Sequence, residues 1–518
     1  MTRCIARSIL ISPVILFVVA FVFNGVVVAQ EPKAGGTLKI AFESDVPGMD
    51  PHTSLGVQVQ VLIPSLFNTL VTIDENLEIV PDLSSSWEVK DGGKTYMFHL
   101  HKGVKFHDGT ECDAAAVKWN FDRMLNPEEK VLTAPFFTMI EAVEPVDAQT
   151  LKITLQYPTE TFLRALANYR KGFPIISPTG YKTWGKQDSP AHPIGTGPFK
   201  LAKWEQNALI LLERHGQYFK PGLPYVDKIE FRIMKDGVTR AAALRAGEVD
   251  FVNLVPIEHV ERLAKDPKMR VFRGPETATI FLVANNGRKP FDDVRVRQAT
   301  IGYGIDRRVI AKSALLGLAS PLVSFVPQGT LGHKDFLELY PYDPNRAKAL
   351  LKAAGFDERH PLKYTLMTHG ANPVLPTIAT IIKTQLGHSG VEVNVEVLDR
   401  PVFLKRLQTH DHDQLLTIGS HFVDPYARAY LMESTGGSLN TPNHSDTHVD
   451  VLIDKLRRSV DREEFLNVGY ELQAYDAERL IYPSVTGDPF VQAARDYVKG
   501  YVFLRGLKVS FESVWLNR

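Results

Sequence analysis

The sequence predicts an α/β fold, because segments with strand patterns and segments with helix patterns alternate along its length. Residues 150–157, TLKITLQY, alternate apolar and polar side chains, as a half-buried strand does. Residues 343–356, DPNRAKALLKAAGF, enter through Asp-Pro, carry Ala and Leu at helical spacing and stop at Gly355. A chain of 518 residues, 44% of them hydrophobic, has material for two or three domains.

The remaining elements follow in chain order. Residues 36–43 predict the first strand. Residues 236–251 predict a helix that stops near Gly247 and then a short strand. Residues 290–317 predict one long helical region, and residues 377–399 predict a helix, a turn and a strand. Because side chains alternate along a strand, four valines of the last strand are expected on one face: Val391, Val393, Val395 and Val397.

The first thirty residues predict an export signal. Arg3 and Arg7 precede an apolar stretch at residues 9–29, and small residues at Val27 and Ala29 suit a cut before Gln30. The alternative is an uncleaved membrane anchor, since the stretch is just long enough to span a bilayer. Pro13, Asn24 and Gly25 interrupt it and favour cleavage after Ala29. We therefore expect an exported protein, with residues 1–29 as its signal peptide.

Composition excludes several classes of protein. Lys plus Arg and Asp plus Glu both number 59, and no basic run occurs, so nucleic-acid binding is not expected. Cleavage would remove Cys4 and leave Cys112 alone, which excludes an internal disulfide and a cysteine-based zinc site. No cofactor is expected.

Three histidines lie within residues 99–107. Residues 95–106, TYMFHLHKGVKF, are predicted as a hairpin arm ending at the Asp108-Gly109 turn. His99 and His101 share one strand face, and two imidazoles at that spacing can hold zinc if a third ligand arrives. His107 lies across the turn region. We favour a structural hairpin with a solvated strand face over a metal site.

The sequence contains no strong catalytic motif. The chain has neither G-x-S-x-G nor H-E-x-x-H. The GTG at 195–197 is followed by Pro198 and a strand-like run, so it predicts a tight chain crossing and not a phosphate loop. The DHD at 411–413 with His410 predicts a solvated loop between a helix and a strand, with a metal cluster as the alternative. We expect no enzyme activity and no metal site.

Six segments taken together resemble one family, the oligopeptide/dipeptide/nickel class of extracytoplasmic solute-binding proteins, which deliver ligands to ABC importers. They occur in the family's order from about residue 35 to the end. The segments are EIVPDLSSSWEVKDGGKTYMFHLHKGVKFHDGT (78–110), PIGTGPFKLAKWE (193–205), ALRAGEVDF (243–251), KPFDDVRVRQA (289–299), YPYDPNRAKALLKAAGF (340–356) and YVKGYVF (497–503).

The resemblance implies a two-lobed periplasmic-binding-protein fold with three domains and a hinged ligand cleft. The first lobe would combine residues 35–80, 193–284 and 496–518 with a second domain at 81–192. The other lobe would comprise residues 285–495. The chain would cross between the lobes near 282–291 and near 483–490. Closure of such a cleft buries a ligand, and reopening releases it to an ABC permease in the inner membrane. A monomer is expected from the resemblance.

The resemblance also implies where a ligand lies. Family members that bind peptides pair the ligand backbone with two protein segments, as an added strand. MDPHTSLGVQ (49–58) matches the first segment, and IGSHFVDPYARAY (418–430) lies where the second is expected. The implied ligand-binding residues of these segments, with wall positions from the same alignment, are Gly56, Val57, Asn253, Glu276, Gly419, Ser420, His421, Asp424 and Asp488.

The second segment departs from the family pattern. Ser420 replaces a tryptophan, and the carboxylate that holds a peptide's α-ammonium falls on Val423, with Asp424 one residue later. Either Asp424 takes that role or the ligand has no free amino terminus, because an unpaired buried ammonium is costly. If Glu276, Asp424 and Asp488 face one cleft, a cationic or polyhydroxylated ligand is favoured.

Three hypotheses follow. The leading one is a binding protein that captures a peptide or similar small polar ligand. The second keeps the transport role but changes the ligand to an opine, an oligosaccharide or a metal chelate, for which His421 is a candidate contact. The third, a secreted hydrolase, is disfavoured because no nucleophile and base lie at workable spacing.

Overall fold

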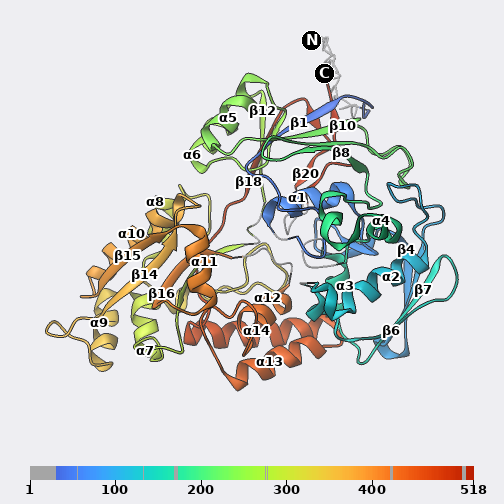
Figure 1. Ribbon diagram of the computed structural model, residues 1–518. Coiled ribbons are helices and arrows are strands. Elements are labelled where there is room, and N and C mark those ends of the chain that lie inside the picture. Colours follow the sequence, from blue (N-terminus) through green and yellow to red (C-terminus); the bar gives the residue numbers. More distant parts are fainter. Residues whose placement is uncertain are drawn as a thin grey trace, which may run out of the picture. The chain divides into compact units, whose positions relative to one another are not determined.

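Two large β-sheets lie in different parts of the computed structural model (Figure 1). The structure describes residues 31–54, 56–131, 133–168, 173–274, 276, 278–419, 424–503 and 509–518. Residues 33–518 form one unit, and the account below concerns that unit alone. Within the described ranges, every helix is too short or too polar to serve as a membrane span. The predicted signal peptide lies outside the described residues.

Within the described residues, the larger sheet has seven strands. Their spatial order is β12 (Met269–Arg273), β18 (Val491–Arg495), β11 (Phe251–Val252), β1 (Thr37–Phe42), β10 (Lys228–Ile233), β9 (Leu209–Arg214) and β8 (Phe199–Glu205). β1 is parallel to β10 on one side and to β11 on the other, so the carboxyl ends of these three strands share an edge. Leu38, Ile40 and Phe42 of β1 are fully buried, which fixes this strand in the core.

The second sheet has five strands among the described residues. Their order is β15 (Glu392–Leu398), β14 (Lys363–His369), β16 (Gln414–Ile418), β13 (Thr279–Ala284) and β17 (Ser484–Gly487). β14 is parallel to β15 and β16, whereas β13 is antiparallel to both of its neighbours. The end of β16 and the start of β13 therefore meet at one edge.

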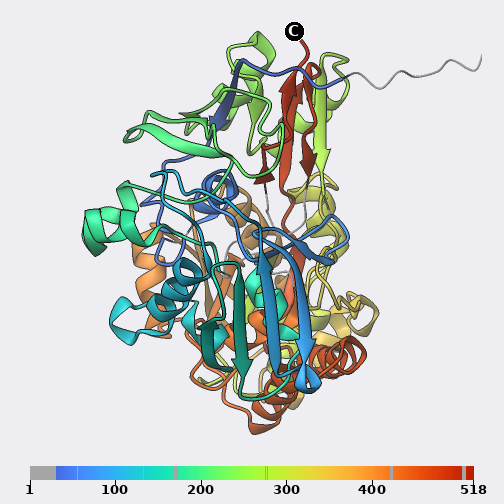
Figure 2. The same ribbon diagram turned by 90° about the vertical axis from the view of Figure 1, so that its right-hand side faces the viewer.

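A smaller antiparallel sheet contains β4 (Ser84–Lys90), β5 (Thr95–Leu100), β7 (Thr150–Leu155) and β6 (Ile140–Pro145), in that spatial order. Figure 2 shows these strands side by side. Leu151, Ile153 and Leu155 are buried while the residues between them are less so, which is the predicted alternation. Two short paired strands, β2 (Val71–Ile73) and β3 (Ile79–Pro81), precede this sheet in the chain.

Most of the longer helices begin at an aspartate whose side chain accepts a hydrogen bond from a first-turn N–H, as at Asp113, Asp236, Asp343 and Asp461. These caps explain why helices start where they do. The helices are α1 (Val57–Leu66), α2 (Ala114–Leu125), α3 (Thr161–Ala167), α4 (Pro178–Asp188), α5 (Gly237–Ala246), α6 (Ile257–Ala264), α7 (Val294–Arg297), α8 (Arg307–Ala314), α9 (Pro344–Ala353), α10 (Val374–Gly387), α11 (Arg400–Gln408), α12 (Pro425–Met432), α13 (Thr447–Arg458) and α14 (Arg462–Arg479).

The last part of the chain returns to the first sheet. β19 (Val498–Lys499) pairs with β22 (Trp515–Leu516), and β20 (Val502–Phe503) pairs with β21 (Val509–Ser510). Val498, Tyr501, Phe511 and Val514 share one hydrophobic cluster with β1, α1 and β10. The C-terminal residues are therefore part of the core of the seven-stranded sheet.

Several predicted elements are confirmed. The first strand, the strand at 150–155 and the helix that enters at Pro344 are present. α5 ends at Gly247, whose φ of 81° is the left-handed conformation that glycine adopts most easily. Gly109 N donates to Phe106 O at 2.9 Å, which confirms the Asp108-Gly109 turn.

Other predictions of local structure are wrong. Residues 290–317 do not form one helix, because Asp306 caps α8 as a new helix after a π-helical stretch, Gln298–Tyr303. The predicted hairpin arm ends as a strand at Leu100, where β5 loses its partner strands. Val393, Val395 and Val397 alternate along β15, as expected, but burial falls along the strand: Val393 is buried and Val397 is 49% exposed.

Strand pairing also moves two predicted domain boundaries. β13 was expected in the first lobe, but both of its edges pair within the five-stranded sheet. β18 was expected in the second lobe, but it pairs with β11 and β12. The chain therefore passes between the sheets after β12 ends at Arg273 and again after β17 ends at Gly487, so the first crossing precedes the predicted 282–291.

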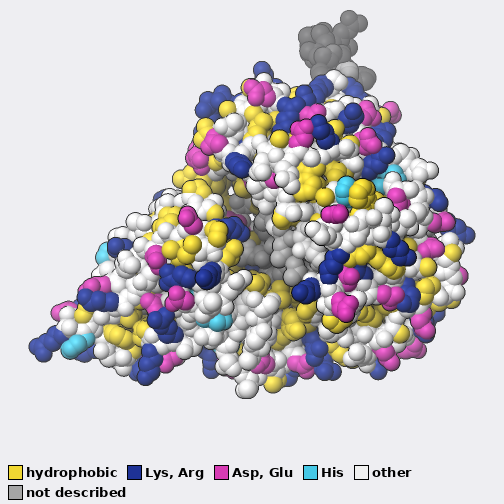
Figure 3. All heavy atoms as spheres, viewed as in Figure 1, with side chains coloured by type: hydrophobic (Ala, Val, Ile, Leu, Met, Phe, Trp, Pro, Cys, Tyr) yellow, Lys and Arg dark blue, Asp and Glu magenta, His cyan; other side chains and the backbone are white. Residues whose placement is uncertain are grey.

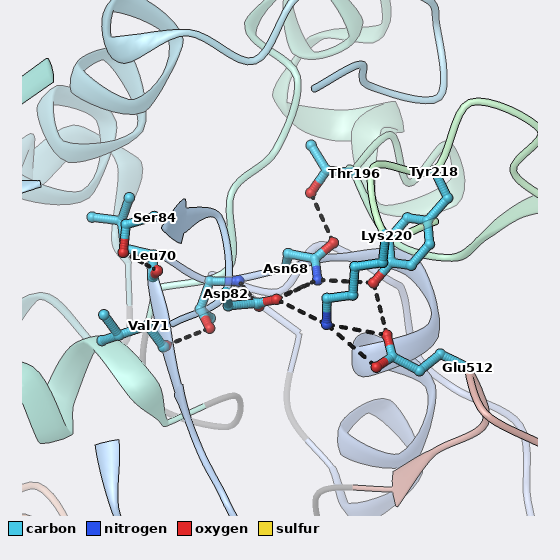
Figure 4. Close-up of polar contacts among 10 residues, drawn as sticks. Asn68, Leu70, Val71, Asp82, Ser84, Thr196, Tyr218, Lys220 and Glu512 are labelled. Carbon is cyan, nitrogen blue, oxygen red and sulfur yellow. Dashed lines mark hydrogen bonds and ion pairs between the residues drawn. The ribbon is translucent and has the colours of Figure 1, made fainter. Parts of the chain in front are cut away.

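A polar network ties the segment after α1 to three other parts of the chain (Figure 4). Asp82 accepts from Asn68 Nδ2 at 2.9 Å and from Thr69 N at 3.0 Å, and Lys220 Nζ lies 3.4 Å from the same carboxylate. Lys220 and the Tyr218 hydroxyl also reach Glu512, near the C-terminus. Segments far apart in the chain are thus joined by charged and neutral hydrogen bonds.

Candidate ligand-binding site

The carboxyl edge of the seven-stranded sheet carries linked polar side chains. Glu43 directly follows β1 and Asn253 directly follows β11, and these strands are parallel neighbours. Asn253 Nδ2 lies 3.1 and 3.3 Å from the two Glu43 oxygens. Gln58 Nε2, from the first turn of α1, donates to Glu43 Oε1 at 2.9 Å. Open α/β sheets bind ligands at this edge.

The side chain of Asn253 is held from behind. Gln492 Nε2 donates to Asn253 Oδ1 at 2.9 Å, and the Tyr501 hydroxyl donates to Gln492 Oε1. Asn253 and Gln492 are fully buried. Because Oδ1 accepts from Gln492, the Asn253 amide must present its N–H groups to Glu43.

α1 begins beside this edge. Gly56 is its N-cap, with φ of 135°, a conformation that favours glycine. Gln60 donates to the Gly56 carbonyl from its backbone at 3.4 Å and from its side chain at 2.9 Å. Val57 is the first residue of the helix, and its side chain lies outside the described part of the structure.

The corresponding edge of the five-stranded sheet contains Gly419, which directly follows β16. Its N–H donates to Thr279 O at 2.8 Å. A Cβ added at Gly419 would lie 2.1 Å from the ring of Phe281. Only glycine therefore lets the backbone lie on this ring. The viewed face of the molecule is hollowed between α1, α11 and α12 (Figure 3).

The two crossing segments bring Glu276 and Asp488 together. Asp488 N donates to Ala278 O at 3.0 Å, and a Cβ on Gly487 would lie 2.5 Å from Glu276 Cδ. Ser320 N donates to Glu276 Oε1 at 2.9 Å. Burial raises the pKa of Glu276, and burial together with the Glu276 charge raises the pKa of Asp488 to about 6.

A buried charged cluster lies beneath the second edge. Arg428 is 1% exposed; its Nη2 donates to Thr279 Oγ1 at 3.0 Å, and its guanidinium lies 4.4 Å from the Phe281 ring centroid. Glu433 and Asp476 are fully buried and interact electrostatically with Arg428. Burial and the Asp476 charge raise the pKa of Glu433 well above its usual range, and burial raises that of Asp476 to about 7.

Asp424 has a helix-capping role in this structure. Its Oδ1 accepts from Ala427 N at 3.1 Å at the start of α12, and the residue is 5% exposed. Burial raises the pKa of this carboxyl group, and the cap and Arg164 oppose that rise. The structure shows no contact between Asp424 and either Glu276 or Asp488.

The predicted residues thus fall into groups. Gly56 and Asn253 share the first edge, and Glu276, Gly419 and Asp488 surround the start of β13, whereas Asp424 caps α12. Ser420 and His421 lie outside the described residues. Sequence reasoning missed Glu43, Gln58 and Gln492. For Glu43 a signal existed, since a charged residue directly follows the first strand of an α/β sheet.

Two of the three histidines at 99–107 have polar protein partners. His99 Nε2 lies 3.1 Å from Glu88 Oε1 on an exposed strand face. His107 Nδ1 accepts from Gly195 N, and its Nε2 contacts Gly197 O, both at 3.2 Å. Burial lowers the pKa of His107 to about 3, so the ring is neutral.

The GTG at 195–197 is a tight crossing, as predicted. Cβ atoms added at Gly195 and Gly197 would lie 2.2 and 2.4 Å from the Leu66 backbone. The loop at 410–413 differs from its prediction, because His412 is 1% exposed and not solvated; burial lowers its pKa to about 4. Within the described ranges, no three His, Cys, Asp or Glu residues are grouped as metal ligands.

Several known proteins are similar to this chain in sequence and in fold. The chain is 33% identical to the glutathione-binding protein GsiB of Pectobacterium atrosepticum over 383 residues, covering 74% of this chain and 73% of that protein. Two solved structures, each 26% identical with a TM-score of 0.81, are similar along 93% and 94% of this chain and 99% of theirs. They are AgaA of A. tumefaciens R10 with agropinic acid and the ABC transporter-associated DppA of Helicobacter pylori with peptide STSA.

A third solved structure shows the fold alone. CtaP of Listeria monocytogenes, an ABC transporter substrate-binding protein, is 23% identical with a TM-score of 0.84, and covers 94% of this chain and all of its own. The sequence model of bacterial extracellular solute-binding proteins, family 5, matches residues 78–440. This chain therefore belongs to the family 5 extracellular solute-binding proteins, the ligand-binding components of ABC importers.

Proposed function

We propose that this chain captures a peptide or a similar small polar ligand and delivers it to its permease. The observation that carries the ligand class is the match along 74% of the chain to a protein named for binding glutathione, a modified tripeptide. The H. pylori relative crystallised with a tetrapeptide points the same way. No catalytic step is part of the proposal, because relatives are named as binding proteins.

The proposed cleft lies between two lobes joined by the crossings after β12 and after β17. One lobe would contain the seven-stranded sheet together with residues 81–192, and the other would contain the five-stranded sheet. Closure about two short crossing segments is a common way to enclose a ligand. The chain is proposed to act as a monomer in the periplasm after cleavage behind Ala29.

The proposed ligand contacts are those implied by the resemblance. Backbone pairing with a peptide would use Gly56, Val57 and the Gly419–His421 segment, because main-chain hydrogen bonds are indifferent to peptide sequence. The carboxylates of Glu276 and Asp488 and the Asn253 side chain would form walls. Asp424 Oδ1 accepts from Ala427 N, so an ammonium would be held mainly by Oδ2 of this residue.

A thermal-shift screen of residues 30–518 tests the ligand class. Separate wells hold glutathione, di- to penta-peptides, opines, short oligosaccharides and chelated nickel. A ligand at one hundred times its Kd adds about 2.7 kcal/mol to the free energy of unfolding, which raises Tm measurably. A shift with glutathione or peptides supports the proposal. A shift confined to opine, sugar or nickel wells contradicts the peptide class and retains the transport role.

A further inference from the structure

Among the described residues, no cation lies beside Glu43, unlike two buried acids that follow it in the chain. Asp50, for example, lies 2.6 Å from Arg123 Nη2, and Asp82 lies 3.4 Å from Lys220. Glu43 forms no ion pair with any residue in the described part of the chain. Its carboxylate is only partly exposed, so water screens its charge incompletely.

Two neutral amides fix this carboxylate. Gln58 donates to Oε1, and Asn253, itself held by Gln492, reaches both oxygens. These donors set the orientation of Glu43 but add no positive charge. A carboxylate accepts about four hydrogen bonds, so the two amides leave acceptor capacity for a further donor.

The charged groups near Glu43 form hydrogen bonds with other residues. Arg240 acts on Glu43 only at longer range, since its guanidinium donates to the carbonyls of Met234, Lys235 and Leu254. Asp45, two residues on, accepts from Trp204 Nε1 at 3.0 Å and from Asn207 N at 2.7 Å. Asp236 caps α5 through Thr239.

The location favours a ligand as the missing partner. Glu43 lies at the carboxyl edge of parallel strands and contacts Gln58, two residues after Gly56, so it borders a segment already proposed to bind ligand. β12 ends and β18 begins at this same edge of the sheet. Glu276 lies three residues after the end of β12, and Asp488 lies four residues before Gln492 of β18, so both add negative charge near this edge. We propose that Glu43 binds the ammonium group of the ligand, a role that rests on the proposed peptide-like ligand.

The assignment moves the ammonium contact from the second lobe to the first. Asp424 then keeps its cap on α12 and does not need to move. A charge-assisted hydrogen bond from an ammonium to Glu43 is stronger than a neutral one. The loss of the family carboxylate at Val423 would be offset by this residue.

Isothermal titration of residues 30–518 with paired probes tests the proposal. The probes are glutathione, the tetrapeptide Ser-Thr-Ser-Ala, and the N-acetyl form of each. Glu43→Gln keeps an acceptor for the two amides and removes the charge, Glu43→Asp keeps the charge, and Asp45→Asn is the matched control. We expect Glu43→Gln to weaken the free-amine probe at least tenfold and to leave the N-acetyl probe within twofold of wild type.

Glu43→Asp should recover part of the loss, and Asp45→Asn should bind both probes as wild type does. Equal weakening of both probe forms, or none, overturns the role of Glu43 while leaving the ligand class standing. If Glu43→Gln does not fold, a Glu43→Ala chain that keeps the wild-type preference for the free-amine probe overturns the role equally. Wild-type protein that binds no probe in either form overturns the peptide-like ligand, and this assignment with it.

Discussion

Two charged clusters of this protein are built in opposite ways. The Asp82 network of Figure 4 joins Asp82, Lys220 and Glu512 with neutral partners, and its Lys220 and Glu512 side chains keep 33% and 24% of their surface exposed. The Arg428 cluster joins Arg428, Glu433 and Asp476, none of them more than 1% exposed. Neither Glu433 oxygen has a hydrogen-bond partner within the described residues.

The difference shows what burial does to an ion pair. In the Asp82 network each charge meets an opposite charge or a donor, and the pKa of Lys220 is raised by Asp82 and Glu512 despite its burial. In the Arg428 cluster burial outweighs the opposite charge, so both carboxyl pKa values rise and protons are retained. We expect the first cluster to stabilise at any physiological pH and the second to respond to pH.

The largest expected effect comes from breaking the Arg428 cluster. Arg428→Met leaves two buried acids without their cation and should lower the free energy of unfolding by about 3–5 kcal/mol at pH 7.5. The loss should shrink at pH 5.5, where both acids can be protonated. Chemical denaturation at the two pH values measures it.

Removing the whole cluster is the matched control. Arg428→Met combined with Glu433→Gln and Asp476→Asn should recover most of the loss, since replacing every member of a buried ionic group is often close to neutral. A single variant that is equally destabilised at both pH values would contradict the electrostatic explanation and point to lost packing on Phe281.

The next largest effect is expected in the pH dependence of stability that the two buried acids cause. The pKa of Asp476 is raised from 3.8 to about 7 on folding, so between these values the folded chain binds more protons than the unfolded chain. Its stabilising contribution is complete below pH 3.8 and is lost as pH rises through 7. Relative to Glu433→Gln/Asp476→Asn, wild type should lose roughly 2–4 kcal/mol between pH 5 and 8.

Wild type must be compared with the Glu433→Gln/Asp476→Asn variant because buried histidines change the stability of both in the opposite direction as pH changes. The pKa values of His52, His107 and His412 are lowered to about 4, 3 and 4, so each costs stability as pH falls below 6.5. Denaturation midpoints at half-unit pH steps give the difference. Parallel curves for the two chains would show that the acid pair does not take up protons.

Breaking the Asp82 network should cost less and without pH rescue. Asp82→Ala leaves Asn68 Nδ2 and Thr69 N without their acceptor and should lower stability by about 2–3 kcal/mol at both pH 7.5 and pH 5.5. Glu512→Gln, at the exposed end, should cost under about 1 kcal/mol. If Asp82→Ala recovered at low pH as Arg428→Met is expected to, the contrast between the clusters would disappear.

The contact between the Arg428 cluster and the proposed ligand edge can be tested at Gly419. Gly419→Ala places a Cβ 2.1 Å from the Phe281 ring and should cost about 1–3 kcal/mol of stability. Gly387→Ala is the control, because a Cβ there meets nothing within 4 Å. Thermal unfolding compares the two; equal melting points would mean that Phe281 moves aside freely.

The smallest effect is expected at an exposed pair. Arg462 Nη1 lies 2.8 Å from Glu78 Oε1, with the side chains 43% and 51% exposed. Arg462→Ala should change stability by less than about 1 kcal/mol, and added salt should abolish the change. A larger loss of stability that persists in 1 M salt would mean that this contact between α14 and the start of β3 stabilises the fold more than an exposed ion pair should.

Local patterns predicted much of the fold, and long-range pairing decided the rest. Period-two alternation at 150–155 and the Asp-Pro entry at 344 are local, and both elements are where the sequence places them. The sheet to which β13 belongs depends on β16 and β17, more than 120 residues away along the chain, and no local pattern encodes that choice. The same holds for His412, which becomes buried only in the folded chain.

The candidate site was predictable in part for the same reason. Gly56, Asn253, Glu276 and Gly419 follow from the family resemblance and not from a local pattern. Glu43 stands out only once Gln58 and Asn253 are seen to converge on it from distant segments. Asp424 could be expected as a helix cap from Asp-Pro alone, a signal that competed with its proposed ammonium role.

Residues 30–518 contain one thiol, and its rate of chemical modification can measure how often this part of the protein opens. Cys112 is 4% exposed, and burial raises its pKa, so little reactive thiolate is available in the folded chain. Reagents that modify thiols should therefore react only when the four-stranded sheet region opens. The labelling rate, measured by mass spectrometry with no engineered residue, would give the free energy of that opening and any change that a bound ligand produces.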